Sequence, residues 1–238
     1  ASPRRKRRCL PVNVMTNSVC YAPLIGQHGS RRVKALTMMN QRRYDRLQEV
    51  LENRIGRLTC AVESLYHRHN VSAVLRTCDS VGVQHVHLVE GNFHAAKGTT
   101  KGAERWLTLH KHHSPSDAIA ALRNQGFSIW IADFAEDGVA PEAVPTDTPI
   151  CVWLGAELVG VSEEARQAAD GVITIPMSGF AQSLNISVAA AVILYSLSQR
   201  VRSDLGADAH LPDEERQALW DMWLAREEAM RVGIQHRS

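Results

Sequence analysis

The chain of 238 residues contains no apolar run of the roughly 18 residues that a membrane-spanning helix requires; its longest such stretch lies near residues 188–194. Its five cysteines are scattered and form no Cys-x-x-Cys pair, which argues against a disulfide framework and against structural zinc. Hydrophobic residues make up 45% of the chain and charged residues 22%, as in ordinary globular proteins. We therefore expect a protein of the reducing cytoplasm, with neither membrane nor metal among its partners.

The common sequence motifs for nucleotide binding and for nucleophilic catalysis are also missing. The chain has no GxxxxGK[ST], no GxGxxG after its first expected strand and no GxSxG. A nucleotide-dependent oxidoreductase is therefore disfavoured. Histidines are plentiful and include the pairs His85-x-His87 and His110-x-His112. Because no cysteine or carboxylate accompanies them at a fixed spacing, exposed or strand-face histidines are a better interpretation than a metal site.

Acidic residues are absent from the first 43 positions, which hold ten of the 27 Lys and Arg residues. The remainder carries a net charge of −8, so RNA phosphates would have to be bound by this head or by local basic clusters. Residues 1–39 show little periodicity and are interpreted as a basic, disordered extension outside the fold. An upstream read-through, a mis-chosen start, an RNA-binding arm and a transit segment are the alternatives.

Apolar residues then recur at helical spacing over residues 40–53, while arginines occupy the other positions, which predicts a basic amphipathic helix. Strands and helices alternate after it. Strands are expected over residues 59–65, 84–90, 105–110, 127–134, 150–154 and 171–175, and helices over residues 71–80, 114–125, 162–169 and 187–203. This alternation predicts an α/β fold with a mostly parallel sheet and helices on both faces.

A terminal helix is expected after residue 211, with an apolar face that contains Leu219, Trp220, Trp223 and Leu224. This face has two interpretations: it caps the core of its own chain, or it meets a second copy. We favour the second copy, because the central α/β unit looks complete without this helix.

Three loops that follow expected strands contain polar residues suited to a ligand site. The first leads through Asn70, a possible helix cap, to the fixed guanidinium of Arg76. The second contains Gly155 and Gly160, which let backbone approach a ligand, together with Glu157. The third lies between the last strand and a long apolar helix, where Ser183, Asn185 and Ser187 are placed to cap the helix N-terminus.

Taken together, these loops resemble the three motifs of the SPOUT RNA methyltransferases, and specifically the TrmH-type tRNA (guanosine-18 2′-O-) methyltransferases. The resemblance rests on Asn70-Val-Ser-Ala-Val-Leu-Arg76, Leu154-Gly-Ala-Glu157 and Ile175-Pro-Met with Gln182-Ser-Leu-Asn185-Ile-Ser-Val. It extends from about residue 40 to about residue 225. It implies a homodimeric enzyme that depends on S-adenosylmethionine and whose C-terminal chain forms a deep trefoil knot.

The resemblance also implies roles for individual residues. It assigns catalysis to Arg76, at the ribose 2′-hydroxyl and its phosphate, with Asn70, Glu157, Ser183 and Asn185 as the polar partners. Backbone around six residues would hold the cofactor: Ala132, Leu154, Gly155, Ile175, Met177 and Leu184. The family usually has His-Lys-Pro-His-Asn before the first helix, whereas this chain has Tyr66-His-Arg-His-Asn70, so the geometry of this loop departs from the pattern.

RNA contacts are expected from local clusters of basic residues in the first helix, in the first motif and in or just after the Gly/Lys/Thr-rich loop 91–102, namely Arg42, Arg43, Arg46, Arg68, Lys97, Lys101 and Arg105. The resulting division is an extension (1–39), a basic helix (40–57), a SPOUT methyltransferase domain (58–205) and a C-terminal helical extension (206–238). The expected activity is 2′-O-methylation of a guanosine in the tRNA D-loop. An rRNA 2′-O-methyltransferase and a non-catalytic RNA-binding relative are the alternatives.

Overall fold

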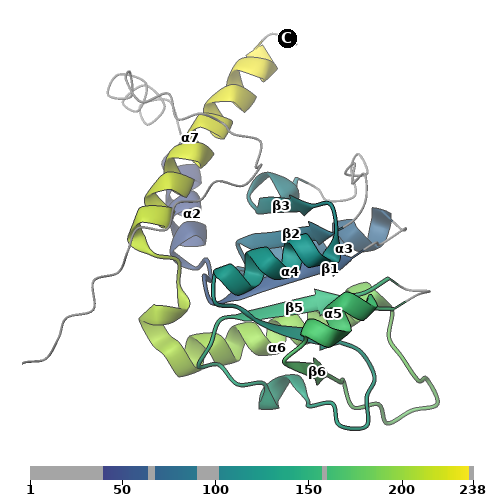
Figure 1. Cartoon of the computed structure of the whole chain (residues 1–238). Helices are drawn as coiled ribbons and strands as arrows, with labels where there is room; N and C mark the ends of the chain where they lie inside the picture. Colours follow the sequence, from purple (N-terminus) through teal and green to yellow (C-terminus); the bar gives the residue numbers. More distant parts are fainter. Residues whose placement is uncertain (1–39, 64–67, 90–101, 157–159, 236–238) are drawn as a thin grey trace, which may run out of the picture.

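A six-stranded, wholly parallel sheet forms the centre of the molecule in the computed structural model, which describes residues 40–63, 68–89, 102–156 and 160–235 (Figure 1). Its strand order is β3-β2-β1-β5-β4-β6. The strands are β1 (Leu58–Glu63), β2 (His85–Val89), β3 (Thr108–His112), β4 (Ser128–Ala132), β5 (Ile150–Leu154) and β6 (Gly171–Ile173). The predicted α/β class with a parallel sheet is confirmed.

Helices cover both faces of this sheet, as expected when parallel strands are joined by helical crossovers. The α-helices are α2 (Gln41–Glu52), α3 (Arg68–Val81), α4 (Pro115–Asn124), α5 (Glu163–Ala168), α6 (Ile186–Leu205) and α7 (Asp213–Gln235). Short 3₁₀ turns are η1 (Ala103–Arg105), η2 (Pro141–Ala143) and η3 (Gly206–Ala209). In Figure 1, α4 and α5 lie on one face of the sheet and α6 lies behind it.

The alternation of side chains along each strand divides the core into two layers. In β5, Val152 and Leu154 pack with residues of α3 and α6, whereas Cys151 and Trp153 pack with residues of α4 and α5. All five residues of β5 are buried, which matches the continuous apolar run of a central parallel strand. Cys151 is a buried free thiol, as are Cys60 and Cys78.

The helix ends follow their capping residues closely. Ser114 caps α4, its hydroxyl accepting from the Asp117 N–H, with Pro115 in the first turn, as predicted. Three strand predictions need correction. The last strand, expected over residues 171–175, ends at Ile173. The predicted strand 105–110 is displaced, because Arg105 belongs to η1 and β3 begins at Thr108. The strand predicted over residues 127–134 is shorter, because the chain leaves the ladder after Ala132 to form a polar loop.

A third apolar cluster joins α2 to α7, which lie side by side in Figure 1. Trp223 is fully buried there and meets Trp106 edge to face, with ring centroids 5.5 Å apart. The prediction that this apolar face of the terminal helix meets a second copy is therefore wrong. Leu47 and Leu51 of α2 cover it within the same chain.

Arg54, just after α2, is fully buried. The Arg54 guanidinium donates to Asp79 Oδ1 at 2.5 Å and lies 5.3 Å from the centre of the Trp223 ring. Burial is the main cause that lowers its pKa, and Asp79 opposes that effect. This side chain thus ties α3 to the layer formed by α2 and α7.

Candidate functional site

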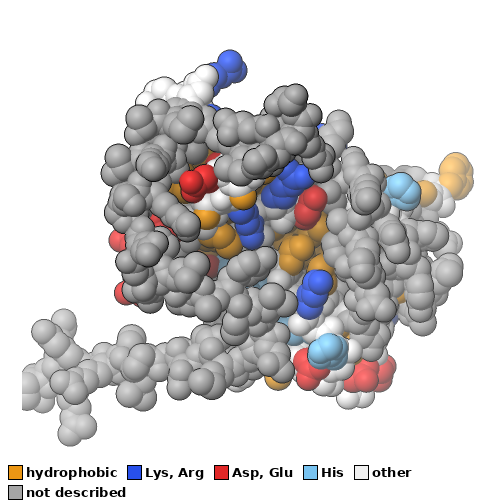
Figure 2. All heavy atoms as spheres, turned by 90° about the horizontal axis from the view of Figure 1, so that it is seen from above, with side chains coloured by type: hydrophobic (Ala, Val, Ile, Leu, Met, Phe, Trp, Pro, Cys, Tyr) orange, Lys and Arg blue, Asp and Glu red, His pale blue; other side chains and the backbone are white. Residues whose placement is uncertain are grey.

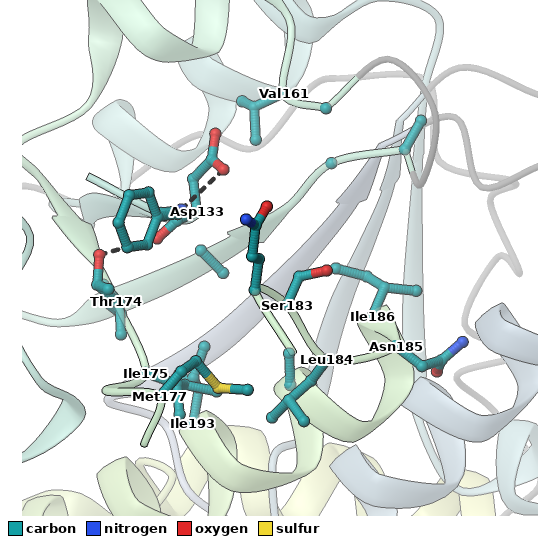
Figure 3. A pocket seen from close by; sticks show the side chains of 18 residues that line it. Asp133, Val161, Thr174, Ile175, Met177, Ser183, Leu184, Asn185, Ile186 and Ile193 are labelled. Atoms are coloured by element: carbon teal, nitrogen blue, oxygen red, sulfur yellow. Dashed lines mark hydrogen bonds between the residues drawn. The ribbon is translucent and has the colours of Figure 1, made fainter. Parts of the chain in front are cut away.

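A cavity of about 430 Å³ opens at the carboxyl edge of β4, β5 and β6 (Figure 3). Its walls come from the loop after each of these strands and from the first two turns of α6. The carboxyl ends of parallel strands are where open α/β sheets bind ligands. The volume lies within the range of about 300–1,000 Å³ that small-molecule sites occupy.

The loop after β5 forms one wall by a close approach of backbone to backbone. Ala156 and Gly160 exchange N–H···O=C hydrogen bonds of 2.8 Å in both directions. A Cβ atom on Gly155 would lie only 2.4 Å from the Gly160 carbonyl carbon, and Gly160 itself has a φ of +76°. Gly155 has no room for a side chain, and the positive φ of Gly160 favours glycine. These glycines were predicted to let backbone approach a ligand, whereas here they let two backbone segments approach each other.

A buried carboxylate holds the far end of this loop. Glu63, the last residue of β1, accepts from the Trp153 indole N–H at 2.7 Å and from the Ser162 backbone N–H at 3.2 Å. Ser162 in turn caps α5 through its hydroxyl. Since β1 and β5 are neighbours in the sheet, Glu63 attaches the wall of the cavity to the core.

The loop after β4 is attached to β6 by Thr174. The Thr174 hydroxyl donates to the Asp133 carbonyl at 2.9 Å and accepts from the Ala135 N–H at 3.2 Å. The Asp133 carboxylate forms an ion pair with Arg166 of α5 at 2.5 Å. These contacts hold the loops after β4, β5 and β6 together at the cavity rim.

The start of α6 forms the remaining wall. Asn185 caps the helix, its side-chain oxygen accepting from the Ser187 N–H at 2.9 Å, so the predicted cap is confirmed at this residue. The helix begins at Ile186 and therefore includes Ser187, which is not a cap. Figure 3 shows Ile175, Met177, Leu184 and Ile193 as the apolar side of the cavity.

The structure brings most of the expected cofactor-binding residues together. The members that line the cavity are Ala132, Gly155, Ile175, Met177 and Leu184, joined by Ser183 and Asn185 from the expected catalytic set. Leu154 is buried in β5 and does not line the cavity, although its neighbour Gly155 does. Glu157 lies outside the described residues.

The two remaining expected catalytic residues lie on α3. Asn70 is the third residue of this helix, not a residue that caps it from outside, so the capping prediction is wrong for this position. Arg76 lies two turns along the helix with its side chain exposed to solvent. Neither residue is among those that line the cavity.

The expected RNA-binding arginines of α2 are exposed, and two of them have acidic partners. Arg43 pairs with Glu227 of α7 at 2.5 Å, and Arg46 pairs with Glu49 at 2.8 Å. Arg42 is exposed on the same helix. Figure 2, which views the molecule from above, shows Lys or Arg side chains next to Asp or Glu side chains among the described residues. Arginines of α2 therefore lie in a surface of mixed charge.

Of the other expected RNA contacts, Arg105 is exposed on η1 and its guanidinium lies against the sulfur of Met230. Lys97 and Lys101 lie outside the described residues, and so does the side chain of Arg68.

Sequence patterns missed four residues that shape the cavity: Glu63, Asp133, Thr174 and Gln182. Asp133 and Thr174 each come directly after a strand, and polar residues at that point are a usable signal for a ligand site. Glu63 carried no such signal, because an acidic residue at the end of an apolar strand is normally read as the beginning of a loop. Gln182 lies within the third motif, but the sequence pattern assigned it no role.

Four histidines form a stacked array on the face of β2 and β3. His85 Nδ1 lies 2.9 Å from His110 Nε2, and His87 Nδ1 lies 2.9 Å from His112 Nε2. Glu215 of α7 contacts the other nitrogen of His85 at 2.5 Å. In the described part of the chain no group of three or more histidines, cysteines and carboxylates is arranged to hold a metal ion.

Burial and the neighbouring histidines lower the pKa of three members of this array, His87, His110 and His112. Desolvation lowers the pKa of His87 to about 2 and that of His110 to about 4, and charge repulsion from the neighbouring histidines adds to the effect. The pKa of His112 is also lowered, mainly by desolvation. The strand-face interpretation of these histidines thus agrees with their geometry.

Comparison with known proteins identifies the family to which this arrangement belongs. The model of the SpoU rRNA methylase family matches residues 57–195, more than half of the chain and all of the elements around the cavity. The chain belongs to the SpoU methylase family. Within the described ranges no helix of this family member is long and apolar enough to cross a membrane.

Curated relatives of this SpoU methylase cover most of its length. It is 40% identical to the tRNA (guanosine(18)-2′-O)-methyltransferase of Thermus thermophilus over 76% of this chain and 95% of that protein. The enzyme of the same name from Escherichia coli is 37% identical over 76% of this chain and 81% of that protein. The crystal structure of the A. aeolicus TrmH/SpoU tRNA modifying enzyme matches with a TM-score of 0.70 and 35% identity, covering 78% of this chain and 96% of that one.

Proposed function

We propose that this chain transfers the methyl group of S-adenosylmethionine to the ribose 2′-hydroxyl of a guanosine in the tRNA D-loop. The observation that carries the proposal is the cavity that the loops after β4, β5 and β6 form with the start of α6. The tRNA methyltransferases that are 37–40% identical over 76% of the chain support the choice of substrate. We expect this reaction to take place in the cytoplasm, where tRNA is modified.

The cavity fits S-adenosylmethionine by shape and by chemistry. Gly155, Ala156 and Gly160 line one wall of the cavity, and the two glycines have no side chains, so a ligand at this wall meets backbone peptide groups. The apolar side formed by Ile175, Met177 and Leu184 suits an adenine ring and a thioether. When bound, this cofactor supplies an electrophilic methyl group attached to sulfur.

The protein's own contribution is to position and neutralise the ribose oxygen. Arg76 holds the 2′-hydroxyl and the adjacent phosphate and stabilises the charge that develops on the oxygen. A guanidinium keeps its proton under all ordinary conditions, so Arg76 is not the general base. The hydroxyl proton passes to an RNA phosphate or to water.

We also infer that the active enzyme is a homodimer. On the side of α6 that does not face the cavity, Val188, Val192 and Tyr195 expose 48%, 42% and 61% of their surfaces, and they recur at helical spacing. Since Arg76 does not line the cavity of its own chain, a second copy packed on α6 would bring further residues to the site. The same proposal includes the trefoil knot, formed by the segment around β6 and α6.

The test of the proposed activity uses an unmodified tRNA transcript and methyl-labelled S-adenosylmethionine, followed by mapping of the methylated nucleotide. We expect a methyl group on a D-loop ribose and a loss of roughly a hundredfold or more in rate for Arg76→Ala. Lys111→Ala removes an exposed charge from β3 and serves as the matched control, with unchanged rate.

Three outcomes would contradict this assignment. Methylation of an rRNA fragment in place of tRNA would favour the rRNA alternative. Cofactor binding without transfer to any RNA would favour a non-catalytic relative, and the absence of cofactor binding would refute a methyltransferase altogether.

A further inference from the structure

Asp133 is the one ionisable side chain among the described residues that line the cavity. It follows β4 directly, at the carboxyl edge of the sheet. Figure 3 shows it away from the apolar side chains of Met177 and Ile193. A carboxylate in a small-molecule cavity fixes the orientation of a ligand, because it accepts hydrogen bonds only from groups placed to donate them.

The hydrogen bonds of this carboxylate leave room for a ligand. Its Oδ1 accepts from the Phe134 backbone N–H at 2.8 Å, and its Oδ2 accepts from the Arg166 guanidinium at 2.5 Å. An ionised carboxylate offers about four lone-pair positions, so roughly two remain for donors inside the cavity. The side chain is about one-third exposed, at 32%, so these positions are accessible.

The charge of Asp133 is already matched within the protein. Arg166 also lies against the loop after β5, where its Nη2 atom would be 3.4 Å from a Cβ placed on Gly160. An ammonium group at the same carboxylate would face this guanidinium and be repelled by it. Neutral hydroxyl groups donate without adding charge, so they fit the site better.

S-adenosylmethionine offers both kinds of donor, a vicinal diol on its ribose and an ammonium group on its amino-acid end. We propose that Asp133 accepts hydrogen bonds from the two ribose hydroxyls of the cofactor and thereby makes the cavity specific for a ribonucleoside. Arg166 holds the carboxylate in place for this role. The inference rests on the proposed function, because it assigns one part of the same cofactor site.

The experiment measures binding by titration calorimetry with two ligands that share a nucleoside. S-adenosylhomocysteine carries the amino-acid end, whereas 5′-methylthioadenosine lacks it. We expect Asp133→Ala to weaken both ligands by the same factor, roughly tenfold to a hundredfold, as for the loss of hydrogen bonds to a charged acceptor. Arg166→Gln retains the carboxylate but removes the ion pair that holds it, and should cost only a few-fold. Lys111→Ala, at an exposed position on β3, is the control and should bind both ligands as the wild-type protein does.

A deoxy ligand distinguishes a direct contact from a general weakening of the loop. The wild-type protein should bind 3′-deoxy-5′-methylthioadenosine much more weakly than 5′-methylthioadenosine, and Asp133→Ala should bind the two almost equally. Asp133→Asn, which preserves the shape of the side chain and one acceptor oxygen, gives the same comparison if the alanine variant does not fold.

Each contrary outcome has a separate meaning. If Asp133→Ala weakens S-adenosylhomocysteine but leaves 5′-methylthioadenosine unchanged, the carboxylate binds the ammonium group and the inference is wrong. Unchanged binding of both ligands, or equal discrimination against the deoxy ligand by the variant, also overturns it and leaves the proposed function standing. If the wild-type protein binds neither ligand, the proposed function fails and the inference fails with it.

Discussion

Two desolvated histidines, His87 of β2 and His110 of β3, make the stability of this protein sensitive to acid. His87 is 1% exposed and has a pKa of about 2, and His110 has a pKa of about 4, whereas a histidine in the unfolded chain titrates near 6.5. Between those values the unfolded state binds more protons than the folded state. The free energy of unfolding therefore falls as the pH drops below about 6.5, and rises again as the pH is raised.

The size of the effect follows from the same values. One pKa unit corresponds to about 1.4 kcal/mol, and pH 5.0 lies about 1.5 units below the unfolded pKa of histidine. At pH 5.0 both folded-state pKa values are still lower than the pH, so each of the two histidines remains neutral in the fold. Each should lower the free energy of unfolding by about 2 kcal/mol between pH 7.5 and pH 5.0, an order-of-magnitude figure.

Urea unfolding followed by far-ultraviolet circular dichroism at a series of pH values measures this directly. His87→Asn keeps a hydrogen-bonding group near His112 but cannot titrate, so the drop in stability between pH 7.5 and pH 5.0 should shrink by about 2 kcal/mol. His113→Asn, at an exposed position just after β3, is the control and should leave the drop unchanged. An equal drop in the wild-type protein and in His87→Asn would refute the reasoning.

Three further predictions concern the site and its surroundings. Gly155→Ala should abolish binding of S-adenosylhomocysteine in calorimetry, because its Cβ would lie 2.4 Å from backbone of the facing loop; retained affinity would show that the cavity wall adjusts. Trp223→Ala should lower the free energy of unfolding by about 3–5 kcal/mol in urea titrations, since this ring is fully buried between α2 and α7; a loss below 1 kcal/mol, roughly the effect of a surface substitution, would contradict that packing. Val192→Asp should halve the mass measured by light scattering to the 26.4 kDa of one chain, because a charge on the exposed face of α6 prevents its burial against a second copy, whereas Lys111→Asp should leave the mass unchanged. A single-chain mass for the wild-type protein would refute the homodimer.

Local sequence signals identified most of the elements and much of the cavity. The apolar run of β5, the Ser114-Pro115 start of α4 and the Asn185 cap of α6 depend on neighbouring residues along the chain, so spacing alone was enough to place them. For Gly155 and Gly160 the sequence predicted a close approach of backbone to a ligand, whereas the structure shows the backbones of the two residues in close approach to each other. The three motifs together, by their resemblance to a known family, predicted the cofactor and the reaction.

Only the tertiary structure decided which of these segments meet. That Glu63 holds the loop after β5 depends on β1 and β5 being neighbours, although they are far apart in the sequence. The ion pair between Asp133 and Arg166 likewise joins the loop after β4 to α5, a contact that depends on the order of β4, β5 and β6 in the sheet. The helical spacing around Trp223 predicted an apolar face on the terminal helix. It did not indicate whether α2 or a second copy of the chain would cover that face. Local patterns record which face of an element is apolar or polar, whereas the partner of that face is set by long-range packing.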